Sequence, residues 1–248
     1  MKRGRIFDGG APRSVTAEGD LVRVGDRLMA ETEVQWLPPI VPRTTFAIGL
    51  NYADHARELA FKPPTEPLVF LKGPNTFVGH RSTTPRPADV TFMHYECELA
   101  VVIGRTGRRV TEREAFDHVA GYTVANDYAF RDYLENYYRP NLRVKSRDGA
   151  TPLGPWLVDR DEVPDPMNLG IRTTVNGQVT QTGSTRDMIF PIGWLIQYLS
   201  SFLTLSPGDL ILTGTPVGLA DLRPGDEVVT EVEGIGRLVN TVVAAEEG

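Results

Sequence analysis

The stretch that decides the fold is YECELAVVIG, residues 95–104. Side chains alternate between the two faces of a strand, so Glu96 and Glu98 share one face and the residues next to them share the other. The second half of the stretch is apolar on both faces, which is typical of a strand covered on both sides. The stretch therefore predicts a buried sheet, and residues 119–126 supply a second buried strand.

The two glutamates and Asp127 form a candidate metal site. Glu96 and Glu98 would lie about 7 Å apart along the strand, and burying a carboxylate is costly unless it is paired or bound to a cation. Asp127 follows the second strand directly, where functional residues often collect. Oxygen ligands suit a hard divalent ion such as Mg²⁺ or Mn²⁺. Plainer interpretations stay open: a solvated strand face for the glutamates, and a turn or cap residue for Asp127.

Turns and hairpins occupy much of the remaining chain. The sequence has 24 glycines and 19 prolines, spread evenly, which favours short strands separated by turns. Hairpins are expected around Asn176-Gly177 and in the tail, with strands at 227–233 and 237–243. One helix is expected over residues 190–203, and residues 152–166 are interpreted as turn-rich. The expected fold class is mainly β (α+β).

Composition excludes several classes of function. The net charge is −6, and no block of like charges is present that could follow a phosphate backbone, so we expect no nucleic-acid or membrane partner. Cys97 is the one cysteine, and residues 1–5 are not followed by an apolar signal-peptide core. A cytoplasmic location fits these features. No G-x-S-x-G, H-E-x-x-H or Walker-type motif occurs, so a serine or cysteine nucleophile is poorly supported.

Further ionisable residues are candidates for proton transfer and substrate binding. His55 and Glu58 lie three residues apart, so in a helical turn the carboxylate could orient and charge the imidazole; an exposed helix start is the plainer alternative. Lys72, Arg131 and Lys145 could bind substrate carboxylates, although a single residue of this kind is more often a surface charge. His94 shares the face of the glutamates by parity, but we interpret it as structural rather than as a ligand.

Six motifs in order resemble the fumarylacetoacetate hydrolase superfamily, from about residue 43 to the end. They are GLNYADHARE (49–58), PLVFLK (67–72), YECELAVVIG (95–104), NDYAFRD (126–132), VKSRD with PLGPW (144–148 and 152–156) and TGTPVG (213–218). The resemblance implies a mixed β-roll or sandwich with few short helices, usually dimeric. The proline-rich segment 37–42 is the best boundary in the sequence. We therefore expect a small N-terminal β segment over 1–42 and a catalytic domain of this family over 43–248.

The resemblance also implies roles for individual residues. Glu96, Glu98 and Asp127 match the ligands of a divalent metal, Mg²⁺ or Mn²⁺. Lys145 matches an active-site lysine, and His55 with Glu58 matches a catalytic pair on a lid. The positions near the bound ligand are matched by Lys72, Arg131 and Thr215. Arg147 stands where many relatives have Phe, and we expect it to hold a distal carboxylate of the substrate.

Within the superfamily, residues 131–148 are most similar to the isomerases and decarboxylases of 4-hydroxyphenylacetate (homoprotocatechuate) breakdown, in their carboxy-terminal half or an equivalent subunit. This implies decarboxylation of 5-oxopent-3-ene-1,2,5-tricarboxylate, isomerisation of 2-hydroxyhepta-2,4-diene-1,7-dioate, or both, through one dienolate with the metal as electron sink. The expected assembly is a homodimer or a pair with a paralogous subunit.

Other functions stay open at this point. Residues 49–52 lack the extra carboxylate of fumarylacetoacetate hydrolase itself, and the N-terminal segment is short for that enzyme, which disfavours its carbon–carbon hydrolysis. Leu134 replaces a polar residue frequent in relatives that act on oxaloacetate and acylpyruvates, which disfavours an acylpyruvate or fumarylpyruvate hydrolase and an oxaloacetate decarboxylase. A structural paralogue without activity is the non-enzymatic alternative.

Overall fold

The computed structural model describes residues 1–59, 62, 64–134 and 141–246. Strands predominate and helices are few and short, which confirms the mainly β expectation. The strands are β1 (Lys2–Asp8), β2 (Ala11–Glu18), β3 (Leu21–Val24), β4 (Arg27–Ala30), β5 (Gln35–Leu37), β6 (Thr45–Gly49), β7 (Leu68–Lys72), β8 (Phe77–Val78), β9 (Thr83–Arg86), β10 (Met93–His94), β11 (Cys97–Ile103), β12 (Val119–Asn126), β13 (Ala129–Phe130), β14 (Thr151–Asp159), β15 (Gly170–Val175), β16 (Gln178–Ser184), β17 (Leu210–Leu212), β18 (Glu227–Val232) and β19 (Gly236–Ala244). The α-helices are α1 (Ala53–Glu58), α2 (Leu142–Lys145) and α3 (Ile192–Phe202).

The larger sheet has β11 near its middle. Its strand order is β4-β3-β2-β1-β14-β12-β11-β17-β6-β7, with β5 paired to β1 and β8 to β14. All seven residues of β11 are buried, because β12 and β17 flank it within the sheet and other layers cover its faces. The prediction of a buried strand at this position is confirmed.

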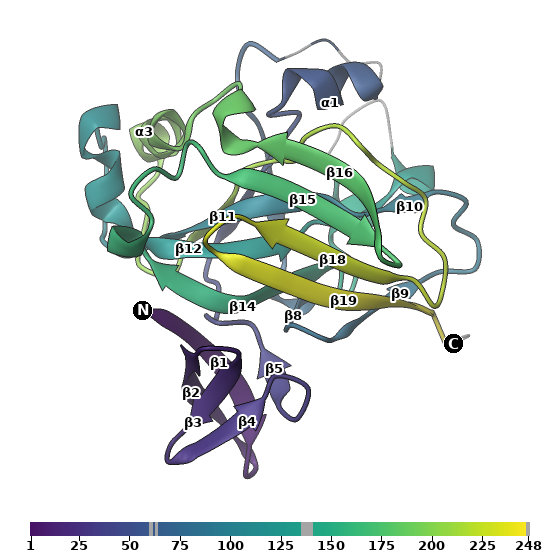
Figure 1. Ribbon diagram of the computed structural model, residues 1–248. Helices are drawn as coiled ribbons and strands as arrows, with labels where there is room; N and C mark the ends of the chain where they lie inside the picture. Colours follow the sequence, from purple (N-terminus) through teal and green to yellow (C-terminus); the bar gives the residue numbers. More distant parts are fainter. Residues whose placement is uncertain (60–61, 63, 135–140, 247–248) are drawn as a thin grey trace.

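A second sheet packs against the first and encloses the main core. Its order is β16-β15-β18-β19-β9, and Figure 1 shows it lying over β11, β12 and β14. Both predicted hairpins, around Asn176-Gly177 and in the tail, are found here. Aliphatic and aromatic side chains of both sheets and of α3 fill the space between the layers, so burial of apolar surface holds the sandwich together.

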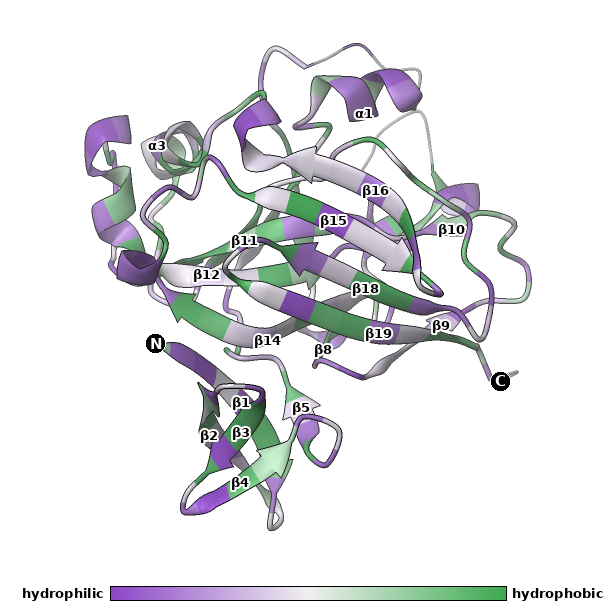
Figure 2. Ribbon diagram, in the orientation of Figure 1, coloured by the Kyte–Doolittle hydropathy of each residue, from purple (hydrophilic) through white to green (hydrophobic). Residues whose placement is uncertain are grey.

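The N-terminal strands form one end of the larger sheet and lie below the remaining strands of both sheets in Figure 1. Strands β1 to β4 are paired in order, and one alternate set of side chains meets in a small core of Ile6, Val15, Val22, Val24 and Trp36. This alternation appears in Figure 2 as hydrophilic and hydrophobic bands along these strands. The group joins the larger sheet where Lys2 and Arg3 of β1 pair with β14. A domain division at residues 42/43 stays a prediction.

One expectation from the sequence is wrong. Residues 152–166 were expected to be turn-rich because of their prolines, yet β14 runs from Thr151 to Asp159. Its ladder with β12 is irregular: Tyr122 pairs with Val158 and Val124 with Gly154, so Pro155 lies in the unpaired stretch between them. A strand accommodates a proline at such an irregularity because no ladder hydrogen bond is lost there.

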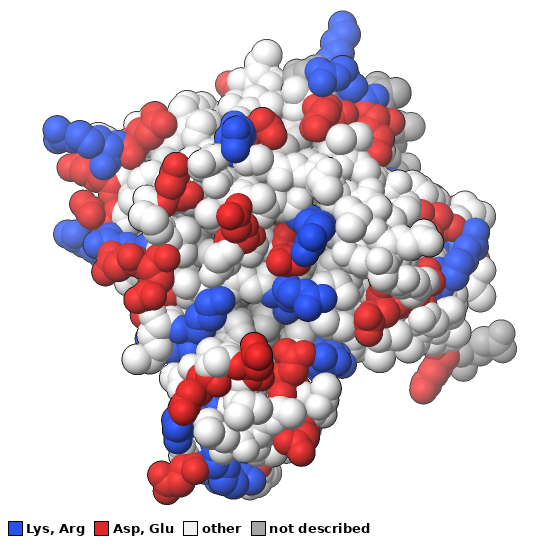
Figure 3. Space-filling model, in the orientation of Figure 1, with Lys and Arg blue, Asp and Glu red and all other residues white. Residues whose placement is uncertain are grey.

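The surface charges and the helices also bear on the sequence expectations. On the face drawn in Figure 3, basic and acidic side chains are interspersed. None of the helices in the described part of the chain is long and apolar enough to cross a membrane. The predicted helix is present as α3, with its apolar face in the main core.

Candidate metal and active site

The pairing of β11 with β12 brings three carboxylates together. The strands are antiparallel and Cys97 pairs with Asn126, so Glu96 at the start of one strand lies beside Asp127 at the end of the other. Carboxylate oxygens of Glu96, Glu98 and Asp127 lie within 4.8 Å of one another, and all three residues are buried. The strand ladder therefore creates a cluster of acidic oxygens.

Backbone and amide hydrogen bonds fix the three carboxylates. The Asp127 amide donates to the Glu96 carbonyl at 2.9 Å, and the Glu96 amide donates to the side-chain oxygen of Asn126 at 3.0 Å. The Gly214 amide donates to Oε2 of Glu98 at 2.6 Å. Gly214 has a φ of 88°, a conformation that favours glycine.

Two buried lysines supply positive charge. Lys72, at the end of β7, forms an ion pair with Asp127 and donates to the carbonyl of Lys145. The Nζ of Lys145, at the end of α2, lies 2.7 Å from Oε2 of Glu96 and 3.1 Å from Oδ2 of Asp127. Burial would lower the pKa of Lys145, but the charges of Asp127 and Glu96 outweigh it and raise that pKa. Lys145 therefore stays a cation at neutral pH.

The carboxylates can hold a further cation. Burial, with the nearby charges of Asp127 and Glu96, raises the pKa of Glu98 well above its ordinary value. Glu98 forms no ion pair with a described residue, and Oδ2 of Asp127, although near Lys145, accepts no hydrogen bond from the described residues. A divalent ion would compensate the buried charge of Glu98 and give Oδ2 of Asp127 a partner. The all-oxygen donor set fits hard ions of the Mg²⁺ and Mn²⁺ type.

His55 and Glu58 form the expected pair on α1. The Nδ1 of His55 lies 3.2 Å from Oε2 of Glu58, and His55 is buried. The other oxygen of Glu58 accepts hydrogen bonds from the backbone amides of Gly218 and Leu219, both at 3.1 Å. The loop after β17 thus holds Glu58 in position to orient the imidazole.

A cavity of about 50 Å³ opens beside the carboxylates. It is lined by four of the predicted site residues, His55, Glu96, Arg131 and Lys145, together with apolar side chains that include Leu134. An imidazole, two basic side chains and one of the three clustered carboxylates therefore face one space.

The other predicted substrate residues lie outside this cavity. Lys72 is fully buried, and its ammonium group balances the charge of Asp127. Thr215 is buried and accepts a hydrogen bond from Gln181 at 3.0 Å. The guanidinium of Arg147 lies 5.5 Å from the ring centre of Phe130 and 5.2 Å from that of Tyr133. Roles for these three residues in substrate binding stay predictions.

Sequence reasoning missed several residues that shape the site. Asn51 is buried and bonds to the backbone of Phe190 and Thr213 through both ends of its amide. Asn126 holds the Glu96 backbone. His94, interpreted from the sequence as structural rather than as a ligand, accepts a hydrogen bond at its Nε2 from Nε of Arg131 at 2.8 Å. In the sequence, Asn126 directly precedes the candidate ligand Asp127, and His94 shares a strand face with Glu96 by parity.

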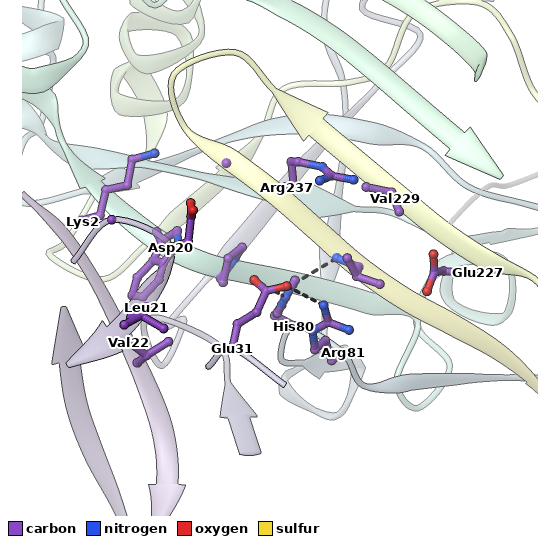
Figure 4. Close-up of a pocket in the computed structure, with 15 residues that line it drawn as sticks. Lys2, Asp20, Leu21, Val22, Glu31, His80, Arg81, Glu227, Val229 and Arg237 are labelled. Atoms are coloured by element: carbon purple, nitrogen blue, oxygen red, sulfur yellow. Dashed lines mark hydrogen bonds and ion pairs between the residues drawn. The ribbon is translucent and has the colours of Figure 1, made fainter. Parts of the chain in front are cut away.

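A cavity of about 640 Å³ lies elsewhere, between the N-terminal strands and β18–β19. Figure 4 shows Glu31 reaching from the N-terminal strands toward His80 and Arg81. Glu31 is ion-paired with Arg81, and its Oε2 lies 3.5 Å from Nε2 of the buried His80. The cavity has mixed charges, and the three carboxylates do not line it, so we assign it no part in the chemistry.

His80 gives this contact a predicted pH dependence. Burial lowers the pKa of His80 to about 4, with Glu31 opposing and Arg81 and Arg237 assisting. Between that value and the ordinary 6.5, the unfolded chain binds a proton that the folded protein does not, so stability falls as pH falls through this window. At pH 5 the loss is on the order of 2 kcal/mol. Denaturant unfolding at pH 8 and pH 5 should show a smaller pH effect in His80→Gln than in wild type; equal effects would contradict the assignment.

The fold and the site together define a β-sandwich protein with a buried cluster of three carboxylates that could hold a divalent cation. The chain belongs to the fumarylacetoacetate hydrolase family: the model of the family's C-terminal domain matches residues 44–243. The resemblance inferred from the six motifs is thereby confirmed.

Several relatives are similar to this chain in sequence as well as in fold. The chain is 66% identical over 203 residues to a 4-hydroxyphenylacetate degradation bifunctional isomerase/decarboxylase of Salmonella dublin, covering 82% of this chain and 47% of that protein. The chain thus spans about half the length of this relative. Among solved structures, a 5-carboxymethyl-2-hydroxymuconate delta-isomerase from Mycobacterium smegmatis is 37% identical with a TM-score of 0.86. A 2-hydroxyhepta-2,4-diene-1,7-dioate isomerase from Mycobacterium marinum is 33% identical with a TM-score of 0.84, and both align over the full length of the two chains.

Proposed function

We propose that this chain decarboxylates 5-oxopent-3-ene-1,2,5-tricarboxylate, isomerises 2-hydroxyhepta-2,4-diene-1,7-dioate, or does both, in 4-hydroxyphenylacetate breakdown. The observation that carries the proposal is the meeting of His55, Arg131 and Lys145 with Glu96 around one cavity. The relatives named for these reactions support it.

Glu96, Glu98 and Asp127 would hold Mg²⁺ or Mn²⁺, which would supply Lewis acidity to the 2-oxo acid end of the substrate. Lys145, held cationic by its two carboxylate neighbours, would stabilise negative charge as it develops on the 2-oxo oxygen. Arg131 would bind a substrate carboxylate through its guanidinium. The side chains around the cavity must move when substrate enters, because about 50 Å³ is smaller than a seven-carbon diacid.

Both reactions use the same residues. Decarboxylation breaks the bond to the remote carboxylate, releases CO₂ and leaves the electron pair on the conjugated chain. Isomerisation then needs a proton removed from the enol oxygen and one delivered to the far carbon. His55, oriented by Glu58, is placed to carry that proton.

The test follows the ultraviolet absorbance of the dienol with each of the two substrates. Chelator-treated protein should be inactive, and Mg²⁺ or Mn²⁺ should restore turnover. If neither substrate reacts with metal present, the proposal is wrong. Turnover of fumarylpyruvate or oxaloacetate instead would assign the chain to the hydrolase or oxaloacetate alternatives, and inactivity toward all four would favour a structural paralogue.

Assembly and location are further parts of the proposal. We expect a homodimer or a pair with a paralogous subunit, because this chain matches only about half of the Salmonella dublin relative. Light scattering of the purified protein, alone and with a paralogous subunit, tests this. We place the protein in the cytoplasm, where its one cysteine, the buried Cys97, would stay reduced.

A further inference from the structure

We propose that His94 is a positioning residue that aims the guanidinium of Arg131 into the active-site cavity. His94 itself does not line that cavity, whereas Arg131 does. The inference rests on the proposed function only in that Arg131 is taken to bind a substrate carboxylate.

Chemistry fixes the tautomer of His94. Arginine can only donate hydrogen bonds, so the Nε2 of His94, 2.8 Å from Nε of Arg131, must be the acceptor. Its Nδ1 lies 3.0 Å from the carbonyl of Tyr95, which can only accept, so Nδ1 carries the proton. Both ring nitrogens are used by a neutral imidazole.

A short two-stranded ladder holds the pair in register. His94 pairs with Ala129 across β10 and β13, and the Arg131 amide donates to the carbonyl of Phe92 at 2.9 Å. Asp132 accepts hydrogen bonds from the amides of Thr91 and Phe92 at 2.9 and 3.0 Å, which fixes the start of β10. The backbone therefore sets the distance between imidazole and guanidinium.

A neutral partner orients Arg131 without cancelling its charge. A carboxylate at the position of His94 would form an ion pair with the guanidinium and compete with a substrate carboxylate. Among the described residues, Arg131 has one acidic oxygen within ion-pair distance, Oε1 of Glu96, 3.6 Å from Nη2, and Glu96 is also paired with Lys145. Nη1 of Arg131 has no hydrogen-bond partner among the described residues. The guanidinium is thus held at one edge and available at the other.

The experiment compares His94→Leu, His94→Gln, Arg131→Met and the double variant His94→Leu/Arg131→Met. It measures KM and kcat for isomerisation of 2-hydroxyhepta-2,4-diene-1,7-dioate, and calorimetric binding of its unreactive saturated analogue 2-oxoheptanedioate to the Mn²⁺-loaded protein. His80→Leu is the matched control, because it also removes a buried imidazole but outside the active-site cavity.

His94→Leu should raise KM and the analogue's Kd about tenfold, as expected when a hydrogen bond to a charged group is lost, with kcat changed less than about threefold. His94→Gln, which keeps an acceptor, should recover most of the loss. The double variant should bind no more weakly than Arg131→Met, because the two residues act through one contact. His80→Leu should leave KM unchanged.

An unchanged KM and Kd in His94→Leu, or fully additive losses in the double variant, would overturn the proposal. If His94→Leu fails to fold, His94→Asn takes its place, since its shorter amide cannot reach the guanidinium. A wild-type protein that binds the analogue but does not turn over the diene would refute the proposed function alone. A wild-type protein that binds neither would overturn both.

Discussion

Glu98→Gln is expected to abolish metal binding and turnover while making the metal-free protein more stable at pH 7. Glu98 is one of the three clustered carboxylates, and the amide that replaces it is a poor ligand for a hard cation. Loss of a residue that only hydrogen-bonds to a metal ligand lowers metal affinity roughly 10- to 100-fold. Loss of Glu98 itself should lower the affinity for Mn²⁺ by more than that. Without metal, burial and the neighbouring carboxylates make the charged form of Glu98 unfavourable and raise its pKa. The neutral amide of the variant avoids this free-energy cost.

The stability gain should depend on pH. A carboxyl whose pKa is raised by folding costs nothing below its unfolded pKa and costs more as pH rises above it. The melting temperature of the metal-free variant should therefore match that of wild type near pH 4 and exceed it increasingly toward pH 8. Calorimetry with Mn²⁺ and thermal unfolding after chelator treatment measure the two effects.

Asp127→Asn is the matched comparison. It also removes a candidate ligand, but it leaves the fully buried Lys72 without its ion-pair partner. We therefore expect equal loss of metal binding with a fall in stability. Glu98→Gln should raise the stability of the metal-free protein and Asp127→Asn should lower it. A change in the same direction in both variants would contradict the assignment of Glu98 as unpaired and Asp127 as paired.

Lys145→Met should lower kcat by about 10²- to 10³-fold, the loss typical of removing one group that stabilises developing charge. It should also destabilise the metal-free protein by about 3–5 kcal/mol, because Glu96 and Asp127 lose a buried cationic partner. Added Mn²⁺ should restore part of that stability, since its charge compensates the same oxygens.

Steady-state kinetics and denaturant unfolding, each with and without Mn²⁺, check this prediction. Lys62→Met is the control, because Lys62 is exposed and its loss should change stability by less than about 0.5 kcal/mol. A Lys145→Met protein with wild-type kcat would exclude Lys145 from the chemistry. A variant whose stability is unaffected in the absence of metal would show that its ion pairs contribute nothing.

Local pattern was enough to predict the central strands, two hairpins and one helix. The buried runs at 95–104 and 119–126, the Asn176-Gly177 hairpin and the helix before Ser206 each have a periodicity or turn signal that tertiary structure did not override. Strand β14 could not be predicted because its prolines resemble a turn, and only the irregular ladder with β12 makes room for Pro155. Strand order across the sheet is likewise set by long-range pairing that no local pattern encodes.

The site was predicted in its ligands more fully than in its surroundings. Strand parity and the position after a second strand made the three carboxylates candidates, and the family resemblance implied their role as ligands. The structure brings the three carboxylates together. The burial of Lys72 against Asp127 depends on β7 lying at the far end of the sheet order, where sequence gives no contact information. Glu58 was expected to orient His55, but its bonds to Gly218 and Leu219 join segments about 160 residues apart.

The pairing of β1 with β14 has a consequence for evolution and for truncation of this chain. The N-terminal strands are hydrogen-bonded to the outer side of a strand whose inner side pairs with β12, the strand that leads to Asp127. Removing residues 1–42 would leave the backbone donors and acceptors of β14 near Leu157 and Val158 open, together with the apolar surface of Trp156. Such an unprotected edge invites pairing with another chain and aggregation. The N-terminal strands thus protect the edge of the sheet that carries the three carboxylates, and a relative without them would need another way to cover that edge.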